Sequence, residues 1–283
     1  MNRIESYTRV IARTLGIRGP FNVQYLVKDG TVYVIELNLR ASRSMPYTSK
    51  STGIPLIWIA GKVMLGRRLS DLKVLKKPRM LHVSVKAPMF SFMRLRGADP
   101  ILGVEMTSTG EVACMDYDFA AAFIKALMAS NIRIPAPSEP VFITVKEEDR
   151  KDVVRIAKKL ISAGYPIYAT RGTAEVLERA GIKGVKVFRK VHESPPESEN
   201  IIKSLMNHEI GLVINTPDIM SRSSIDDSFI IRRTAIEFFI PVITRIETAE
   251  ALTDALLKRG YGTFIRARPL SEFLAGSRFL DKI

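Results

Sequence analysis

The pattern of apolar and polar residues changes about halfway along the chain, and each part predicts a different set of elements. In the first part, two apolar runs at 23–27 and 32–37 flank Asp29-Gly30, a dipeptide that is a strong signal for a β-hairpin. Apolar residues at helical spacing surround this hairpin. The helices predicted in this part cover residues 4–15, 55–65 and 119–128.

The second part alternates short apolar runs with helical patterns. Strands of four or five residues separated by helices are typical of a parallel sheet covered on both faces. We therefore predict an α/β fold class, with an α+β first part followed by a doubly wound parallel sheet. The predicted strands cover residues 141–145, 165–169, 185–188, 212–215 and 242–244, and the predicted helices cover residues 148–163, 174–180, 201–206, 226–239 and 247–258.

Three prolines within residues 134–140 stand between the two parts. Proline removes a backbone donor and favours extended backbone, so we interpret this segment as a linker. The predicted domains are residues 1–133 and residues 141–283, and 283 residues are enough for each domain to bury a core of its own.

Composition limits the class of protein. Hydrophobic content of 46% with 25% charged residues is typical of a soluble globular chain. The longest apolar stretch, 54–65, is too short and interrupted to span a bilayer, and the N-terminus has no signal-peptide pattern. Cys114 is the only cysteine, and the three histidines are not at zinc-ligand spacing. We expect a cytoplasmic protein with no membrane partner.

The positive charge is concentrated in one region. The net charge is +14, and residues 1–80 contain 15 Lys and Arg against 4 Asp and Glu. No helix-turn-helix, zinc finger or RNA-recognition pattern accompanies this charge, so we do not expect nucleic-acid binding. An anionic substrate or an acidic partner surface explains the same excess.

The predicted hairpin carries a candidate metal site. Side chains alternate along a strand, so Glu36 and Asn38 share one face. If the loop comprises residues 29–31, Gln24 falls opposite Glu36. Hard cations such as Mg²⁺ take oxygen ligands of this kind and keep room for substrate phosphates. The alternative is that Glu36 is an ordinary solvent-facing strand residue.

A cluster of cations follows the hairpin. Arg40, Arg43 and Lys50 lie within one short, Ser-rich segment and can supply charge to a phosphoryl group held by the metal. The alternative is that these side chains are ordinary surface charge.

A second candidate site lies where the predicted parallel strands end. Thr170-Arg171-Gly172-Thr173 joins a strand to a helix, where free N–H groups, two hydroxyls and a flexible glycine suit a phosphate. Ligands of parallel sheets bind beyond the carboxyl ends of the strands. The alternative is that Thr173 is only an N-cap and that the nearby lysines are solvated. Other strand ends contribute Lys146, Lys190, Asn215 and Thr216.

The first part resembles the second ATP-grasp half of the large chain of carbamoyl phosphate synthetase. The matching segments are Asn-Val-Gln at 22–24, Ile-Glu-x-Asn-x-Arg-Ala-Ser-Arg at 35–43 and Ser-Lys-x-Thr-Gly at 49–53. Leu39 stands where the family usually has proline. The resemblance implies that the Mg²⁺ or Mn²⁺ ions of ATP bind Gln24, Glu36 and Asn38, and that Arg40 and Arg43 face the phosphoryl-transfer site.

The second part resembles the methylglyoxal synthase-like regulatory domain that ends the same large chain. The matching segments are 141–149, 168–174, 190–193 and 213–217. The resemblance implies that Lys146, Thr170, Thr173 and Lys190 hold the phosphate of a nucleotide effector, with Asn215 and Thr216 lining the pocket. The residues after Glu193 and Pro217 depart from the family pattern, which leaves the effector's identity open.

The implied function is that of a C-terminal section of the large chain, in pyrimidine and arginine biosynthesis. Such a section contributes Mg²⁺–ATP ligands for phosphorylation of carbamate and an effector-binding domain. The implied partners are the remaining section of the large chain and a glutaminase small chain. The family's Gly-rich lid and adenine pocket precede the region of resemblance, so we expect an ATP-dependent ligase part that is inactive alone.

Two other functions compete with this interpretation. The chain can be a non-catalytic, nucleotide-binding regulatory protein in which an ATP-grasp remnant serves for docking. It can also be a methylglyoxal synthase, but that enzyme needs an aspartate in a Gly-Gly-Asp-like turn, and Asp218 lies in no such turn.

Overall fold

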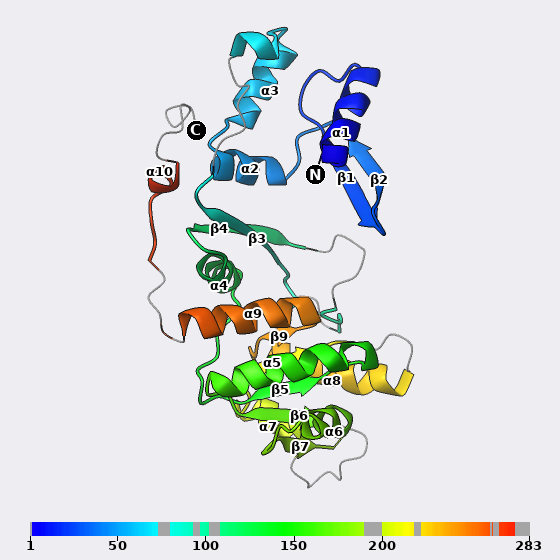
Figure 1. Ribbon diagram of the computed structural model, residues 1–283, viewed down its shortest axis with the longest axis vertical. Helices are drawn as coiled ribbons and strands as arrows, with labels where there is room; N and C mark the ends of the chain where they lie inside the picture. The colour runs from blue at the N-terminus through cyan, green and yellow to red at the C-terminus, as the bar shows by residue number, and fades with distance from the viewer. Residues whose placement is uncertain are drawn as a thin grey trace. The chain divides into compact units, whose positions relative to one another are not determined.

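The computed structural model describes residues 2–72, 80–92, 97–101, 108–189, 200–217, 222–260, 262 and 266–274, with the side chains of 222–226 not described. The chain forms two compact units, residues 1–82 with 267–283 and residues 83–266 (Figure 1). Within the part that is described, no helix has the length and apolarity needed to cross a membrane.

The first unit is built around an antiparallel hairpin, as predicted. Its turn is Asp29-Gly30, and both residues have positive φ (49° and 74°), as a two-residue hairpin turn requires. The elements of this unit are α1 (Asn2–Thr14), β1 (Asn22–Lys28), β2 (Thr31–Asn38), α2 (Ser44–Thr52), α3 (Leu56–Met64), the 3₁₀ helix η1 (Leu69–Leu72) and α10 (Leu270–Phe273).

The register of the hairpin places Gln24 opposite Glu36, as predicted, but by a different route. The loop has two residues rather than three, because Lys28 pairs with Thr31. The extra residue lies inside β2, where a β-bulge at Ile35 shifts the register between Gln24 and Tyr25. The expected three-residue loop is therefore wrong, and the bulge restores the predicted pairing.

The second unit contains an antiparallel pair followed by the parallel sheet. The pair and its helix are β3 (Val83–Met89), β4 (Gly110–Asp116) and α4 (Phe119–Ala129). The sheet is wholly parallel, with strand order β7-β6-β5-β8-β9, and confirms the predicted fold class. Its strands are β5 (Val141–Thr144), β6 (Ile167–Thr170), β7 (Lys186–Phe188), β8 (Leu212–Asn215) and β9 (Val242–Ile243).

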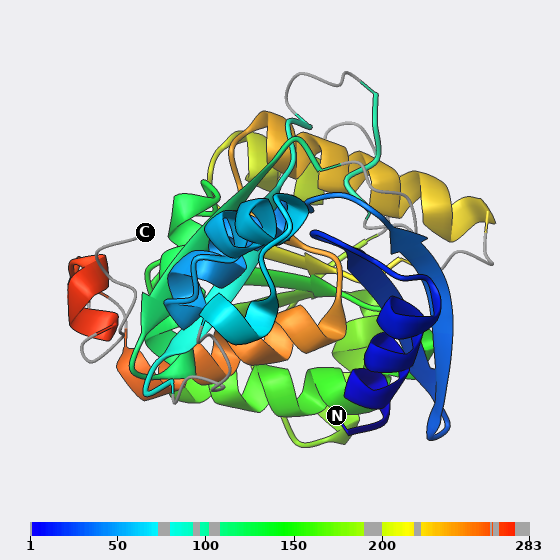
Figure 2. The ribbon, with the colours of Figure 1, turned by 90° about the horizontal axis from the view of Figure 1, so that it is seen from above.

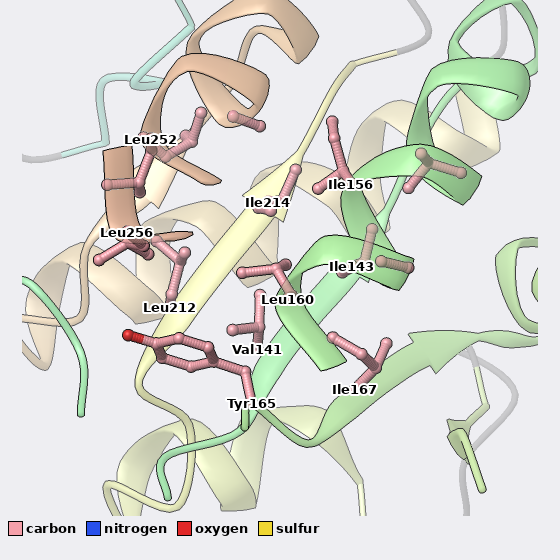
Figure 3. Packing of buried hydrophobic residues seen from close by; sticks show 14 of the residues in the cluster. Val141, Ile143, Ile156, Leu160, Tyr165, Ile167, Leu212, Ile214, Leu252 and Leu256 are labelled. Carbon is pink, nitrogen blue, oxygen red and sulfur yellow. The ribbon is translucent and has the colours of Figure 1, made fainter. Parts of the chain in front are cut away.

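Helices cover both faces of this sheet, so it is doubly wound. They are η2 (Glu147–Asp149), α5 (Arg150–Ser162), α6 (Arg171–Arg179), α7 (Ile201–Met206), α8 (Arg222–Glu237) and α9 (Ile246–Arg259). Val141 and Ile143 of β5 pack in one buried cluster with side chains of α5, α6 and α9, whereas Phe142 points the other way and packs with α7 and α8. Figure 2 shows α5 and α9 on one side of the strands and α8 on the other, and Figure 3 shows the first cluster.

The proline-rich segment 134–140 is held by specific contacts. Tyr165 Oη donates to the Pro135 carbonyl at 2.9 Å, and Arg133 forms an ion pair with Glu139 at 2.7 Å. Gly211 lies directly against this segment, because a Cβ added there would lie 2.9 Å from Pro135 Cβ and 2.5 Å from Glu139 Cβ. The segment therefore belongs to the second unit, and the predicted domain boundaries at 133 and 141 stay a prediction.

The close approach at Gly211 generates a stability prediction. We expect Gly211→Ala to lower the free energy of unfolding by about 1–3 kcal/mol, because the added methyl group has no room. Gly110→Ala is the matched control in the same unit, since its Cβ would lie 3.8 Å from Met89 Cβ at ordinary contact distance. Urea unfolding of the full chain measures both, and equal midpoints for parent and Gly211→Ala would contradict the packing described.

Candidate functional site

Polar side chains gather on one face of the hairpin near its open end. Gln24 lies opposite Glu36, and Asn22 lies opposite Asn38, so all four share this face. Asn38 Nδ2 donates to Glu36 Oε1 at 2.9 Å. The structure thus brings the three predicted ligand residues together. Asn22, which sequence reasoning missed, joins them because it begins the strand in register with Asn38.

The opposite face of the hairpin is positioned by α1. Tyr25 Oη lies 2.7 Å from Thr8 Oγ1, at hydrogen-bond distance, and Thr8 Oγ1 also donates to the Ile4 carbonyl at 2.7 Å. Val23 and Leu37 are half-buried on this face, whereas Gln24 and Glu36 are exposed on the other. The polar face is therefore the one exposed to solvent, and α1 contacts the opposite face of the hairpin.

The donor set of the polar face fits a hard divalent cation. One carboxylate and neighbouring amide oxygens suit an ion that keeps several positions for substrate phosphates and water. Among the described residues, no group of three or more His, Cys, Asp and Glu side chains can hold a metal on its own. The roles of this face as metal and nucleotide site stay predictions.

The predicted cations follow immediately and are exposed. Arg40 lies directly after β2, Arg43 occupies the N-cap position of α2 and Lys50 lies in the last turn of that helix. Arg40 Nη1 donates to the Ala41 carbonyl at 3.3 Å. None of the three forms an ion pair with a carboxylate among the residues that the structure describes. Their charge is therefore available to an anion.

A group of threonine hydroxyls marks the carboxyl edge of the parallel sheet. Thr170 Oγ1, at the end of β6, lies 3.2 Å from Thr144 Oγ1 and 3.4 Å from Thr173 Oγ1. Thr216 Oγ1 accepts from the Lys146 backbone N–H at 3.2 Å. Three neighbouring strands and the start of α6 thus converge here. Thr144 was not predicted, and its place at the end of an apolar strand was the available signal.

The N-terminus of α6 has the properties that suit an anion. Its N-cap residue is Thr170, which makes no side-chain capping hydrogen bond, and Thr173 lies inside the helix with 3% exposure. The alternative interpretation of Thr173 as an N-cap is therefore wrong. Thr173 Oγ1 instead accepts from the Val145 N–H at 3.3 Å. The first N–H groups of α6 remain without a side-chain cap.

A second unpredicted residue, Arg150, lies beside this helix N-terminus. Arg150 Nη2 lies 4.0 Å from the place that a Cβ on Gly172 would occupy, which is ordinary contact distance and puts the guanidinium beside the first turn of α6. Arg150 pairs only with the exposed Glu147 at 3.1 Å among the contacts described. Lys146 Nζ is 3.9 Å from Glu148. Lys190, the other predicted phosphate ligand, lies outside the described residues.

Asn215 and Thr216, at the end of β8, belong to the same edge of the sheet. Asn215 is fully buried, and its Oδ1 accepts from Arg232 Nη1 at 2.9 Å while its Nδ2 donates to the Ser228 carbonyl at 3.3 Å. Thr216 is 5% exposed, and its N–H donates to the Thr144 carbonyl at 3.1 Å. The structure thus gathers the described effector-site residues at one sheet edge, and their role in binding stays a prediction.

Two protein families match separate parts of this chain. The family described as the carbamoyl-phosphate synthase L chain, ATP binding domain, matches residues 1–72, and the family described as the MGS-like domain matches residues 152–244. The crystal structure of ForH aligns at a TM-score of 0.32 and 20% identity over 50% of this chain and 90% of that one, which is too weak to carry an argument.

Curated relatives match along nearly the whole chain. The carbamoyl phosphate synthase large chain, C-terminal section, of Methanocaldococcus jannaschii is 44% identical over 90% of this chain and 42% of its own length. The large chains of Methanosarcina mazei and Methanosarcina barkeri are 40% and 39% identical over 96% of this chain, and over 25% and 67% of their own lengths. The chain thus spans less than half of the first two relatives.

Proposed function

We propose that this chain, which belongs to the family of carbamoyl phosphate synthase large chains, contributes metal–ATP ligands for phosphorylation of carbamate and an effector-binding domain that regulates it. The observation that carries the proposal is the bulged register that sets Gln24 opposite Glu36, with Asn38 bonded to the same carboxylate. The product, carbamoyl phosphate, would serve pyrimidine and arginine biosynthesis, with the protein in the cytoplasm.

The proposed chemistry assigns a role to each side chain of the first unit. Glu36, with the amide oxygens of Gln24 and Asn38, would hold Mg²⁺ or Mn²⁺, which when bound neutralises phosphate oxygens. Arg40 and Arg43 would stabilise charge on the transferred phosphoryl group. A carbamate oxygen bonds to the γ-phosphorus while the bond to the bridging oxygen breaks, so that carbamoyl phosphate forms and ADP leaves.

Exposed apolar side chains of the first unit suggest that a partner protein binds there. Helix α1 has no buried residue, and large apolar side chains of α1 and the hairpin stay exposed. Exposed apolar area on this scale is typical of an interface. We propose that the remaining section of the large chain covers it, and a glutaminase small chain completes the enzyme. The side chains at least 42% exposed are Tyr7, Val10, Leu15, Leu26, Val27, Tyr33, Val34, Ile35 and Leu39.

The alternative of a non-catalytic regulatory protein is not favoured. Relatives with 39–44% identity are named as synthase large chains, and the region that would serve only for docking keeps the paired polar face and the free cations. A docking remnant has no need for a carboxylate that accepts a hydrogen bond from an amide on an exposed strand.

The second unit would hold the effector. The uncapped N-terminus of α6, the threonine hydroxyls and the guanidinium of Arg150 suit the phosphate of a nucleotide, with a pyrimidine monophosphate as our first choice. Lys146 would add charge, and we propose the same role for Lys190.

The metal role generates the first functional prediction. We expect the chain alone to form no ATP from ADP and carbamoyl phosphate, because it spans less than half of the first two relatives and the rest of their length would be needed to position nucleotide and exclude water. With the remaining section added, turnover should appear, and Glu36→Gln should abolish it without changing the melting temperature, since the amide keeps the shape but loses the charge.

Asp71→Asn is the matched control, because Asp71 is an exposed carboxylate of η1 in the same unit, outside α1 and the hairpin. Its reconstituted activity should equal that of the parent. Robust turnover by the isolated chain, or near-normal activity of reconstituted Glu36→Gln, would overturn the assignment.

The effector role generates the second prediction. Arg150→Ala should weaken binding of uridine monophosphate about tenfold, because it removes a cation beside the phosphate, and rising salt should narrow the difference. Arg155→Ala is the control on the same helix, since Arg155 pairs with Glu250 at 2.8 Å, and it should change affinity less than about twofold. Calorimetric titration of the full chain measures both, and equal loss in the two variants would contradict a site at Gly172.

A further inference from the structure

One buried arginine connects the carboxyl edge of the parallel sheet, which we call the effector edge after its proposed role, to a segment 133 positions away in the sequence. Arg232, on α8, has no exposed surface and donates to two partners. Its Nη1 donates to Asn215 Oδ1 at 2.9 Å, while Nε and Nη2 donate to Asp99 Oδ1 and Oδ2 at 2.8 and 2.5 Å. This is a bidentate guanidinium–carboxylate pair with a third bond to an amide, and its planar fork fixes all three groups in one geometry.

On one side, Arg232 determines the orientation of Asn215. The carboxamide oxygen must face the guanidinium, which only donates, so the amide nitrogen faces the Ser228 carbonyl. Asn215 ends β8 and is followed by Thr216, whose hydroxyl and N–H bond to the backbone of Lys146 and Thr144. Any shift of Arg232 therefore moves the backbone that frames the threonine hydroxyls.

On the other side, Arg232 holds the connection between β3 and β4. Asp99 lies in residues 97–101 of that connection. The next residue, Arg233, also contacts this connection, because its Nη1 donates to the Phe92 and Ala98 carbonyls at 3.0 and 3.3 Å. Its Nε donates to Glu237 of α8 at 2.8 Å. Two consecutive arginines of α8 therefore tie this connection to the sheet edge.

We propose that Arg232 is a positioning residue that couples ligand occupancy of the carboxyl edge of the parallel sheet to the position of residues 97–101, an inference that rests on the proposed effector site. A buried guanidinium that loses its carboxylate is strongly unfavourable, so Arg232 keeps both partners when either moves. A ligand that displaces the end of β8 must therefore displace Asp99 as well. A change at Asp99 should therefore alter ligand affinity at α6, because the two places are coupled through Arg232.

Three variants of the full chain separate coupling from stability. Asp99→Asn keeps the shape of the carboxylate and removes its charge. The double variant Arg232→Met with Asp99→Asn removes the buried charge together with its need for a partner, and should recover part of the stability that Asp99→Asn loses. Glu237→Gln is the control, since it breaks an ion pair of the neighbouring Arg233 without touching Arg232. Urea unfolding checks that each variant is folded under the assay conditions.

The first arm is calorimetric titration with uridine monophosphate. We expect Asp99→Asn and the double variant to change the dissociation constant by about fivefold or more, although neither changes a residue of the phosphate site, and Glu237→Gln by less than about twofold. A purely structural role would lower stability and leave affinity unchanged. Parental affinity in both Asp99 variants would overturn the coupling.

The second arm tests the coupling through Arg232 without a ligand. It is needed if the parent binds no nucleotide, a result that would contradict only the effector part of the proposed function. Hydrogen exchange of the free chain should then be faster at residues 212–216 in both Asp99 variants, and unchanged at residues 153–160 of α5. Unchanged exchange at residues 212–216, or an equal rise at residues 153–160, would show that Arg232 does not couple the two places.

Discussion

The second unit depends on one constraint, which is that β5 and β8 are buried on both faces. Val141, Phe142 and Ile143 have no exposed surface, and successive side chains point to opposite faces, so helices must cover both. Parallel strands then need crossover helices, each beginning at the carboxyl edge of the sheet. The hydroxyls of Thr144 and Thr170 lie together at this edge as a consequence of burial elsewhere.

A polar contact holds the described residues 97–101 of the β3–β4 connection. Arg232 has no exposed surface and must find acceptors for its donors, because an unpaired buried guanidinium is strongly destabilising. Asp99 and Asn215 satisfy it, and in doing so they join a segment before the parallel sheet to the end of a central strand. Burial thus places the carboxyl edge of the sheet, and this charge pair connects the edge to residues 97–101.

Local patterns predicted the strands of the hairpin and of the parallel sheet, most helices and the polar face of the hairpin, because each of these depends on residues close in sequence. The strands β3 and β4 were not predicted. The bulge at Ile35 was not predictable from spacing, and without it the two-residue turn would set Gln24 opposite Ile35. Helix α2 was missed because its Ser-rich sequence is a weak helix former. Its support comes from tertiary contacts, with Ser51 O bonded to His82 Nε2 at 2.8 Å and Ser49 Oγ accepting from the Leu56 N–H.

The residues that sequence reasoning missed at the effector edge share a cause. Arg232 and Asp99 are 133 positions apart, and no spacing rule connects them. Arg150 belongs to a charged run after β5, and only the glycine at position 172 shows that it approaches α6. The linker interpretation of 134–140 described its proline content correctly, yet Gly211 and Tyr165, which hold the segment, lie far along the chain.

The measurement that tests the central claim most directly is paramagnetic broadening of side-chain amide signals. The chain, labelled with ¹⁵N in its Gln and Asn side chains and combined with the unlabelled remaining section, is titrated with Mn²⁺ and a non-hydrolysable ATP analogue. If the hairpin face holds the metal, the signals of Gln24 and Asn38 disappear in the parent chain and keep their width in the Glu36→Gln variant. Sharp signals for Gln24 and Asn38 in the parent chain with nucleotide bound would contradict the account.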